Sequence, residues 1–303
     1  MEQNKFIIIT PAYNEEKYIE TTIKSVLSQT ILPLVWVIVN DGSSDGTAEI
    51  IQAYSQKFNW IIYVHRKKDL NVSYYASNVY AINKGYETAK GLNLNYEYLA
   101  ILDADIELPM DYYEKILNFF SSDSKLGMAS GHCLDRMQNG LKRNIYDWRS
   151  LPKNITVFRK QCYDDINGFM PLKYAGEDTC ACFSARMKGW KTWSTTNLMV
   201  IHNKPLGLNA IAKGKLNLRF KQGISEYFIA THPVFMILKS IKRALSEDPY
   251  IIGGLSRFIG FLYAHFLNEK RQISKDLRKY IRKEQFNRIF GRMKKHVPNN
   301  DNR

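Results

Sequence analysis

Apolar and polar positions alternate along the first hundred residues in a way that predicts strands and helices in turn. Short apolar runs, typical of strands buried on both faces, occur at residues 6–9, 35–39, 60–64 and 98–102. Between them, apolar residues recur at helical spacing within residues 19–27, 50–58 and 76–90. Asn14 is expected to cap the first of these helices. This alternation over short connections predicts an α/β fold with a mainly parallel central sheet flanked by helices.

Polar residues follow three of the predicted strands at the point where each strand ends. They lie at residues 10–14, 40–45 and 103–105. Ligands of open parallel sheets bind outside the carboxyl ends of the strands. We therefore expect these three segments to meet at one rim of the sheet and to form a binding site there.

The pattern changes after residue 125. Residues 126–202 are less regular, with short strands predicted at 157–158 and 199–201 and a helix at 177–188. The pattern of apolar and basic positions in residues 220–295 predicts helices with mixed apolar and basic faces. We therefore divide the chain into an α/β domain at residues 1–203 and a basic, amphipathic helical extension at residues 204–303.

The formal net charge is +14, and much of it lies near the end, where residues 269–303 hold 12 Lys and Arg against 4 Asp and Glu. Such a segment favours an anionic partner, either nucleic acid, anionic lipid or a phosphorylated substrate, although a solvated helix with surplus lysines has the same composition. Only three aromatic residues accompany the charge in residues 269–295, which is too few for a platform that stacks nucleic-acid bases. They are Tyr280, Phe286 and Phe290.

The four cysteines match no zinc-binding spacing, and they are too few for a secreted disulfide scaffold. They are Cys133, Cys162, Cys180 and Cys182. Residues 1–5 are polar and show no signal peptide. The longest apolar candidate, residues 249–267, is interrupted by Arg257 and His265, so we expect no transmembrane helix. These features predict buried, reduced thiols and a cytoplasmic protein.

Asp103-Ala104-Asp105 stands directly after the fourth predicted strand. Two carboxylates one residue apart are costly to bury without a cation. Mg²⁺ or Mn²⁺ prefers oxygen ligands and is commonly held by one or two carboxylates together with substrate phosphates. The segment therefore predicts a divalent metal site, while a polar strand end before the next helix is the alternative interpretation.

Three further polar residues are candidates for chemistry. Asp41 follows the second strand and could bind ribose hydroxyls or a base edge, or serve only in a turn. Asp178 opens a predicted helix and could act as a general base, or simply compensate the helix dipole. His202 ends a predicted strand and is a candidate third metal ligand or phosphate contact, or a satisfied structural histidine.

Taken in order, four segments resemble glycosyltransferase family 2, the inverting, nucleotide-sugar-dependent enzymes of GT-A fold. The resemblance covers about residues 5–203 and is carried by residues 7–16 (IIITPAYNEE), 39–47 (VNDGSSDGT), 102–105 (LDAD) and 176–178 (GED). It implies a Rossmann-like α/β domain that binds a nucleotide-sugar donor with a divalent metal, Mn²⁺ or Mg²⁺.

The resemblance also implies roles for individual residues. The nucleotide-sugar pocket would be formed by Pro11, Tyr13, Glu15, Asp41, Asn78, Asp103, Ala104 and Glu177. Asp105 would ligate the metal that bridges the diphosphate, with Asp103 and His202 as further candidates. Asp178 would be the base that deprotonates the acceptor hydroxyl during an inverting displacement.

The chain departs from the family pattern in two places. Many members carry an Arg-Asn pair where this chain has Ser77-Asn78, which leaves a cationic phosphate contact unassigned. The Gln-x-x-Arg-Trp signature of processive synthases is absent, and residues 219–223 match it only loosely. We therefore expect an enzyme that adds single sugars rather than a processive synthase. The expected donor is a UDP-sugar, ahead of a GDP- or dTDP-sugar. The expected acceptor is a hydroxyl of a glycan or of a polyprenyl-linked molecule in cell-surface polysaccharide or glycoconjugate synthesis.

Apolar segments with basic flanks occur at residues 232–239 and 249–267. Amphipathic helices of this kind can lie in a membrane interface, or they can cap the α/β domain. We expect a peripheral contact with the inner face of the cell membrane, which suits a lipid-linked acceptor.

Two other functions remain as alternatives. A nucleotidyltransferase shares this sheet plan but usually has a Gly-rich, basic loop after the first strand, where this chain reads Thr-Pro-Ala-Tyr-Asn at residues 10–14. A nucleic-acid-binding protein would bind through the basic face, but the small number of aromatic residues there argues against this function.

Overall fold

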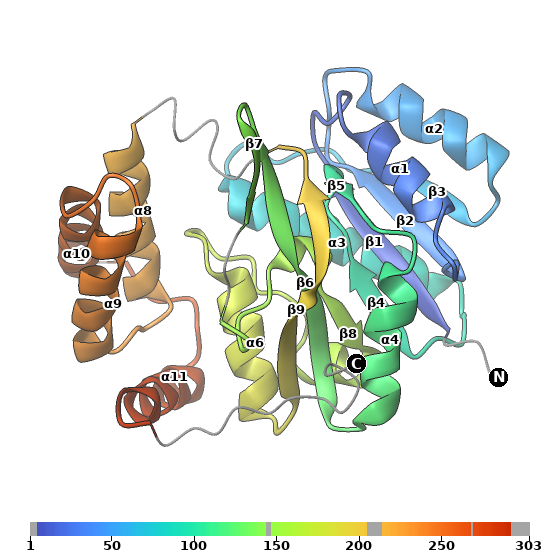
Figure 1. The fold of residues 1–303 in the computed structure, drawn as a ribbon. Helices are drawn as coiled ribbons and strands as arrows, with labels where there is room; N and C mark the ends of the chain where they lie inside the picture. The colour runs from blue at the N-terminus through green and yellow to red at the C-terminus, as the bar shows by residue number, and fades with distance from the viewer. Residues whose placement is uncertain (1–4, 144–146, 205–213, 268, 292–303) are drawn as a thin grey trace.

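The computed structural model describes residues 5–143, 147–204, 214–267 and 269–291. One mixed sheet runs through the α/β part in the strand order β3-β2-β1-β4-β8-β6-β9-β5, with β7 paired to β6 (Figure 1). Its first four strands pair in parallel and are β1 (Phe6–Ala12), β2 (Val35–Asn40), β3 (Ile61–His65) and β4 (Tyr98–Ile101). The predicted parallel strands are therefore confirmed within a few residues at each end.

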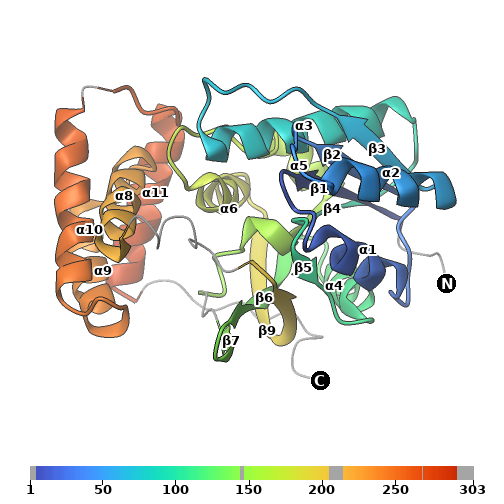
Figure 2. The same ribbon diagram turned by 90° about the horizontal axis from the view of Figure 1, so that it is seen from above.

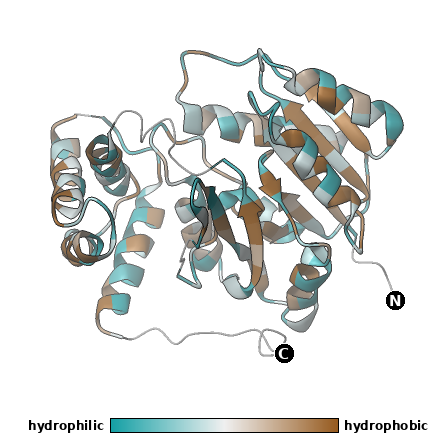
Figure 3. Ribbon diagram, turned by 45° about the horizontal axis from the view of Figure 1, so that its top comes forward, coloured by the Kyte–Doolittle hydropathy of each residue, from teal (hydrophilic) through white to brown (hydrophobic). Residues whose placement is uncertain are grey.

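Helices connect these strands in the βαβ manner that the alternation predicts. They are α1 (Ile19–Leu27), α2 (Thr47–Lys57) and α3 (Tyr74–Gly91). Figure 2 shows α3 on one face of the sheet and α1 on the other. Successive residues of β1 face opposite sides, so that Phe6 and Ile8 join the core under α1, while Ile7 and Ile9 join the core under α3. Figure 3 shows these strands as the most apolar part of the fold.

The second half of the sheet is mixed rather than parallel. The strands are β5 (Ile106–Glu107), β6 (Leu126–Met137), β7 (Gly140–Arg143), β8 (Val157–Arg159) and β9 (Lys191–His202). β8 runs antiparallel to both β4 and β6, whereas β6 and β9 are parallel. The helical elements of this half are α4 (Tyr112–Ser122), η1 (Lys153–Ile155), α5 (Lys160–Asp165) and α6 (Glu177–Met187). The helix predicted at 177–188 is thus confirmed, while the strand predicted at 199–201 is the end of a longer one.

The prediction that Asn14 caps the first helix is wrong. Asn14 has a left-handed backbone with φ of 55°, which asparagine tolerates better than most residues. Its Oδ1 accepts a hydrogen bond from the Ser44 amide at 2.9 Å, and α1 begins only at Ile19. Residues 13–18 therefore form a loop at the carboxyl end of β1 instead of a first helical turn.

The C-terminal extension consists of helices that pack beside α6. They are α8 (Lys215–Phe228), α9 (Pro233–Ser246), α10 (Ile252–Tyr263), η2 (Ala264–Phe266) and α11 (Lys275–Ile289). A buried cluster joins Cys180 and Phe183 of α6 to Leu277 and Ile281 of α11. Within the described residues, no helix is both long and apolar enough to cross a membrane. All four cysteines are buried free thiols, as expected.

Candidate active site

A cleft opens at the carboxyl ends of β1, β2 and β4 and encloses about 430 Å³ of empty space, part of it open to solvent. Its lining gathers residues that follow the parallel strands or begin α3. They are Pro11, Ala12, Tyr13, Glu15, Asp41, Lys68, Tyr74, Asn78, Asp103, Ala104 and Asp105. The three strand ends that the sequence singles out therefore meet at one rim, because parallel neighbours end on the same edge.

Asp41 follows β2 and is buried beneath this cleft. Its Oδ2 accepts a hydrogen bond from Ser77 Oγ at 2.7 Å, and its Oδ1 accepts from Arg66. Lys68 Nζ lies 3.8 Å from the same carboxylate and stacks over the Tyr13 ring, 3.1 Å from its centroid. Two cations and a hydroxyl thus surround the buried Asp41 side chain and offset the cost of its burial.

Asp103 and Asp105 each have a buried Oδ1 atom without a hydrogen-bond partner. Burial raises the pKa of Asp103; Lys153 opposes this shift, with Nζ 3.8 Å from Oδ1, and the nearby Asp105 adds to it. Unpaired carboxylate oxygens at the wall of a cleft are costly unless a ligand or a cation satisfies them. The two oxygens therefore have the chemistry of a hard-cation site.

His202 ends β9 directly behind Asp105, and it does not line the cleft. Its Nε2 lies 3.2 Å from Asp105 Oδ2, and its Nδ1 lies 2.9 Å from Asp135 Oδ1. Burial alone would lower the pKa of His202, but the hydrogen bonds that its ring donates to both carboxylates outweigh burial and raise the pKa to about 10. The geometry makes His202 a clamp that orients Asp105, and its role as a metal ligand stays a prediction.

No preformed protein cage for a metal appears in the part of the chain that the structure describes, since no three His, Cys, Asp or Glu side chains converge suitably. This arrangement is compatible with Mg²⁺ or Mn²⁺, because such ions usually take only one or two carboxylates and fill their remaining positions with water and substrate phosphates. The two unpaired oxygens of Asp103 and Asp105 are the matching ligands on the protein side.

Glu177 and Asp178 begin α6 and lie next to the cleft rather than in its lining. Lys153 connects the cleft wall to the start of α6. Its Nζ lies 3.8 Å from Asp103 Oδ1 and 4.0 Å from Glu177 Oε1, and it donates a hydrogen bond to Asn78 Oδ1. Burial and the neighbouring Glu177 raise the pKa of Asp178 above its ordinary range. A carboxylate with a raised pKa is a stronger base than a solvated one, as proton abstraction from a hydroxyl requires.

Glu15, in the loop after β1, is a further buried carboxyl of the cleft wall. Burial raises its pKa to about 7, and Asp105 adds to this shift. Lys204 opposes it, with its Nζ 2.7 Å from Glu15 Oε1. Glu15 Oε2 is buried without a partner. Glu15 and Asp105 therefore form one acidic wall that only partly pairs with protein cations.

Four cations at or beside the cleft were missed by sequence reasoning. They are Arg66, Lys68, Lys153 and Lys204. The basic run at residues 65–68 follows β3, so the strand-end rule could have found the first two. The other two come from the mixed half of the fold and carry no local signal. Together they are candidates for the cationic phosphate contact that Ser77 cannot provide.

The sequence model of glycosyl transferase family 2 matches residues 7–190, well over half of the chain. The chain belongs to this family. Its fold is accordingly the GT-A fold, and the resemblance carried by the four sequence segments is confirmed. The protein carries a family 2 glycosyltransferase domain with a helical extension.

Individual relatives are more distant. TuaG of Bacillus subtilis (strain 168), named for teichuronic acid biosynthesis, is 35% identical over 127 residues, which are 42% of this chain and 46% of TuaG. The mannosyltransferase PcManGT from Pyrobaculum calidifontis, solved with GDP-Man and Mn²⁺, has a TM-score of 0.56 and 14% identity, and the match covers 94% of this chain and 85% of that one. S. aureus TarS 1-349, solved with UDP-GlcNAc, has a TM-score of 0.53 and 15% identity, covering 91% and 78%.

These matches differ in what they establish. The chain spans less than half the length of the curated relatives it matches. At their low identities, the two solved structures show the fold alone.

Proposed function

We propose that this family 2 domain transfers a sugar from a nucleotide-sugar donor, most favourably a UDP-sugar, to a hydroxyl with inversion at the anomeric carbon. One observation carries the proposal: a single cleft gathers Asp41, Asp103 and Asp105, and Lys153 links Asp103 to Glu177, the residue before Asp178. Donor-holding groups and a base on a neighbouring rim are what an in-line displacement requires.

The donor's nucleoside fits the Asp41 end of the cleft. Asp41 is fixed by Arg66 and Ser77, and its remaining acceptor capacity suits ribose hydroxyls or a base edge. Tyr13 offers an aromatic face nearby, under Lys68. The fold relatives were solved with UDP-GlcNAc and with GDP-Man, so both nucleotides belong in a first screen.

The diphosphate fits beside Asp103 and Asp105, whose Oδ1 atoms are buried without a hydrogen-bond partner. A divalent cation bound there, Mn²⁺ or Mg²⁺, would neutralise charge that develops on the departing nucleoside diphosphate. Lys153 and Lys204 contribute fixed positive charge beside it. Asp105 is the principal proposed ligand, with Asp103 second; His202 fixes the Asp105 carboxylate and is a third candidate.

Asp178 is the proposed base that accepts the proton of the acceptor hydroxyl. The raised pKa of its carboxyl, caused first by burial and then by Glu177, favours this role near neutral pH. We propose as acceptor a glycan or a polyprenyl-linked sugar used in cell-surface polysaccharide or glycoconjugate synthesis. The C-terminal helices would hold the enzyme at the inner face of the cell membrane, beside such an acceptor.

A thermal-shift screen of UDP, GDP and dTDP, with and without Mn²⁺, tests the donor site directly. A nucleotide at 100 times its Kd stabilises the folded state by about 2.7 kcal/mol, so its binding raises Tm. We expect the largest shift with UDP and Mn²⁺ together. Asp105→Ala should lose the Mn²⁺-dependent part of that shift.

Two results would count against the proposal. If no nucleotide raises Tm under either condition, the donor site is wrong. If Asp105→Ala retains the full Mn²⁺-dependent shift, the metal assignment is wrong while the donor site stands. Asp111→Asn, on the exposed start of α4, is a control for an unspecific loss of an aspartate.

A further inference from the structure

The outer helices of the C-terminal extension carry their large apolar side chains toward solvent. In α9 the exposed apolar residues are Val234, Ile237, Leu238, Ile241 and Leu245, which share one face at helical spacing. In α10 every exposed side chain is large and apolar: Ile252, Leu255, Ile259, Leu262 and Tyr263. More than half of the exposed large apolar side chains in the described residues lie between Leu216 and Phe266. α9 and α10 pack on each other at the side of the molecule away from the sheet (Figure 1).

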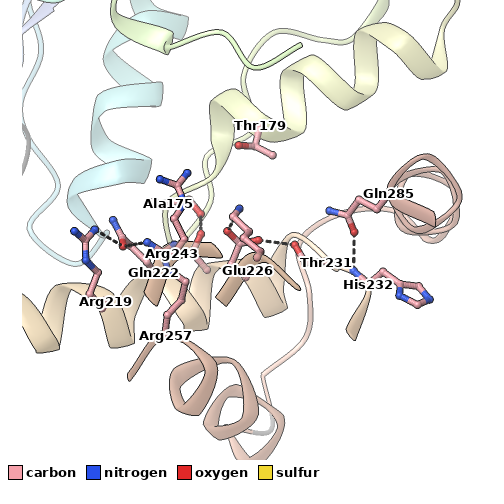
Figure 4. A network of polar contacts seen from close by, with 12 residues as sticks. Ala175, Thr179, Arg219, Gln222, Glu226, Thr231, His232, Arg243, Arg257 and Gln285 are labelled. Carbon is pink, nitrogen blue, oxygen red and sulfur yellow. Dashed lines mark hydrogen bonds and ion pairs between the residues drawn. The ribbon is translucent and has the colours of Figure 1, made fainter. Parts of the chain in front are cut away.

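The interior of this unit combines a small apolar cluster, which includes Ile224 and Phe228, with buried polar and charged groups. Glu226 of α8 is buried and accepts hydrogen bonds from Lys239 of α9 and from Thr231. Arg257 of α10 is also buried, and its Nη2 donates to Gln222 Oε1 at 2.5 Å. Figure 4 shows Glu226 beside Thr231, and Arg257 beside Gln222, between the helices.

A second acidic residue completes the polar interior. Glu247 accepts from Arg257 at 3.0 Å, lies 3.2 Å from Arg219 Nη1, and pairs with Arg243. The charged groups that α8, α9 and α10 turn inward therefore pair with one another, although Arg219 Nε and Arg257 Nε are buried without a hydrogen-bond partner.

Glycines allow the three helices to approach closely. A Cβ on Gly223 of α8 would lie 1.9 Å from the Arg257 carbonyl oxygen, and one on Gly260 of α10 would lie 2.0 Å from the Phe220 carbonyl oxygen. A Cβ on Gly254 would lie 2.5 Å from the Ser240 carbonyl oxygen of α9. Small residues and polar groups at the contacts, with large apolar residues outside, are the pattern of helices that pack within lipid. A water-soluble bundle has the opposite arrangement.

The helices are too short to cross a bilayer. α9 has 14 residues and α10 has 12, so at about 1.5 Å per residue they reach about 18–21 Å, against about 30 Å of hydrocarbon. Helices of this length with an apolar outer face can lie along the interface of one leaflet. The loop between them adds the exposed Tyr250 and Ile251 to the same unit.

Charge decides between lipid and a second copy of the chain as the occupant of this face. Residues 215–266 hold seven Lys and Arg against three Asp and Glu. Four of these cations pair with Glu226 or Glu247 between the helices, and the only charged residue among the exposed positions of α9 is Lys242. The neighbouring α11 exposes further cations, including Lys279, Arg282 and Lys283. Two copies would bring like charge together, whereas anionic headgroups would complement it.

We propose that α9 and α10 insert their outward faces into one leaflet of an anionic bilayer, with α8 between them and the catalytic domain. Ser225 of α8 donates a hydrogen bond to the Ala175 carbonyl, three residues before Asp178. The inserted unit is therefore in direct contact with the segment that carries the proposed base. This deepens the proposed membrane contact and, resting on the proposed function, indicates an acceptor hydroxyl presented at the bilayer surface.

The test is flotation of the full chain with vesicles of phosphatidylcholine alone or mixed with phosphatidylglycerol. The insertion variant is Ile237→Gln/Ile241→Gln/Ile259→Gln, which removes apolar side chains that are 44%, 55% and 47% exposed. We expect its partitioning into anionic vesicles to fall by at least about 100-fold, given the apolar area withdrawn from lipid. The matched control, Leu32→Gln/Leu92→Gln/Met110→Gln, changes exposed apolar residues of the catalytic domain and should bind as the parent does.

A second comparison separates insertion from simple charge attraction. Lys279→Ala/Arg282→Ala/Lys283→Ala on α11 should weaken binding only at low salt, because exposed charges are screened. The inference is overturned if the parent does not float, if the insertion variant floats like the parent, or if sedimentation shows that the parent dimerises through this face and the variant does not.

Folding and activity controls make each outcome decisive. The insertion variant should keep the parent's circular dichroism and Tm, because the changed side chains are exposed. Transfer to a water-soluble acceptor should be equal in both proteins. Absence of transfer in both, with flotation lost only in the variant, would refute the catalytic proposal and leave the insertion surface intact.

Discussion

Single residues in this site act through the charges that surround them. Lys153 lies between Asp103 and Glu177, and its charge favours the ionised form of the adjacent Asp178, whose pKa burial and Glu177 raise. The proposed base is therefore a carboxylate that binds a proton more readily than an ordinary aspartate but is still ionised near neutral pH. This balance follows from burial and the charge of Glu177, opposed by hydrogen bonds from Thr179 and by the charge of Lys153.

Asp178→Asn tests this residue. The amide cannot accept the proton, so kcat should fall about 10²–10⁴-fold, while the Kd for the donor nucleotide stays unchanged. In the parent, kcat should fall as pH drops through the raised pKa of Asp178, because protonation removes the base, and this acid limb should lie above the usual range of an aspartate. A variant that retains full transfer would assign the base elsewhere.

Helix α6 owes its position to the turn that precedes it. Gly176 has φ of +123°, a backbone conformation that L side chains rarely adopt, and a Cβ there would lie 2.6 Å from Ile229 Cγ2 at the end of α8. The neighbouring Ala175 carbonyl accepts from Ser225 of α8. The start of α6, which carries Glu177 and Asp178, is therefore packed directly against the C-terminal extension.

Gly176→Ala should disturb this packing. We expect a loss of about 1–3 kcal/mol in the free energy of unfolding from backbone strain, a further loss from the contact with Ile229, and a lower kcat with little change in donor Kd. Gly189→Ala, at the other end of α6, is the matched control: φ there is +88°, but its Cβ would meet nothing within 4 Å. Equal effects on kcat from both variants would exclude the contact as the cause.

At the scale of the whole molecule, the C-terminal extension packs against the catalytic domain through buried contacts. Arg186 of α6 makes two hydrogen bonds to Glu284 of α11, at 2.8 and 3.1 Å, and also donates to the Arg149 carbonyl. Glu284 is buried, and the Arg186 guanidinium lies over the ring of Phe183, a member of the apolar cluster that joins α6 to α11. The boundary predicted at residue 203 stays a prediction, but the two parts share a core.

Glu284→Gln should weaken the contact between α6 and α11. Removing one partner of a buried ion pair leaves the other charge uncompensated, which costs about 3–5 kcal/mol. We expect a lower free energy of unfolding in urea and faster proteolysis within α11. Glu20→Gln, which breaks the exposed pair with Lys24, should leave the free energy of unfolding nearly unchanged, because water and salt screen exposed charges. If the two variants unfold alike, α11 does not stabilise the fold through this pair.

The sequence by itself determined the parallel half of the sheet and the place of Asp41, Asp103 and Asp105. Buried strands have a continuous apolar pattern, and parallel neighbours end on the same edge, so local patterning was enough to bring these residues together. The helix that begins with Glu177 was also predictable from its own periodicity.

Only the tertiary structure decided which cations join the site and which way the C-terminal helices face. Lys153 and Lys204 reach the cleft from the mixed half of the sheet, where long-range pairing, which no local pattern encodes, sets their positions. The apolar and basic faces of residues 220–295 were visible in the sequence, but their orientation was not. Periodicity defines the two faces of a helix, whereas the partners available for close packing decide which face turns inward; here these are glycines and paired charges.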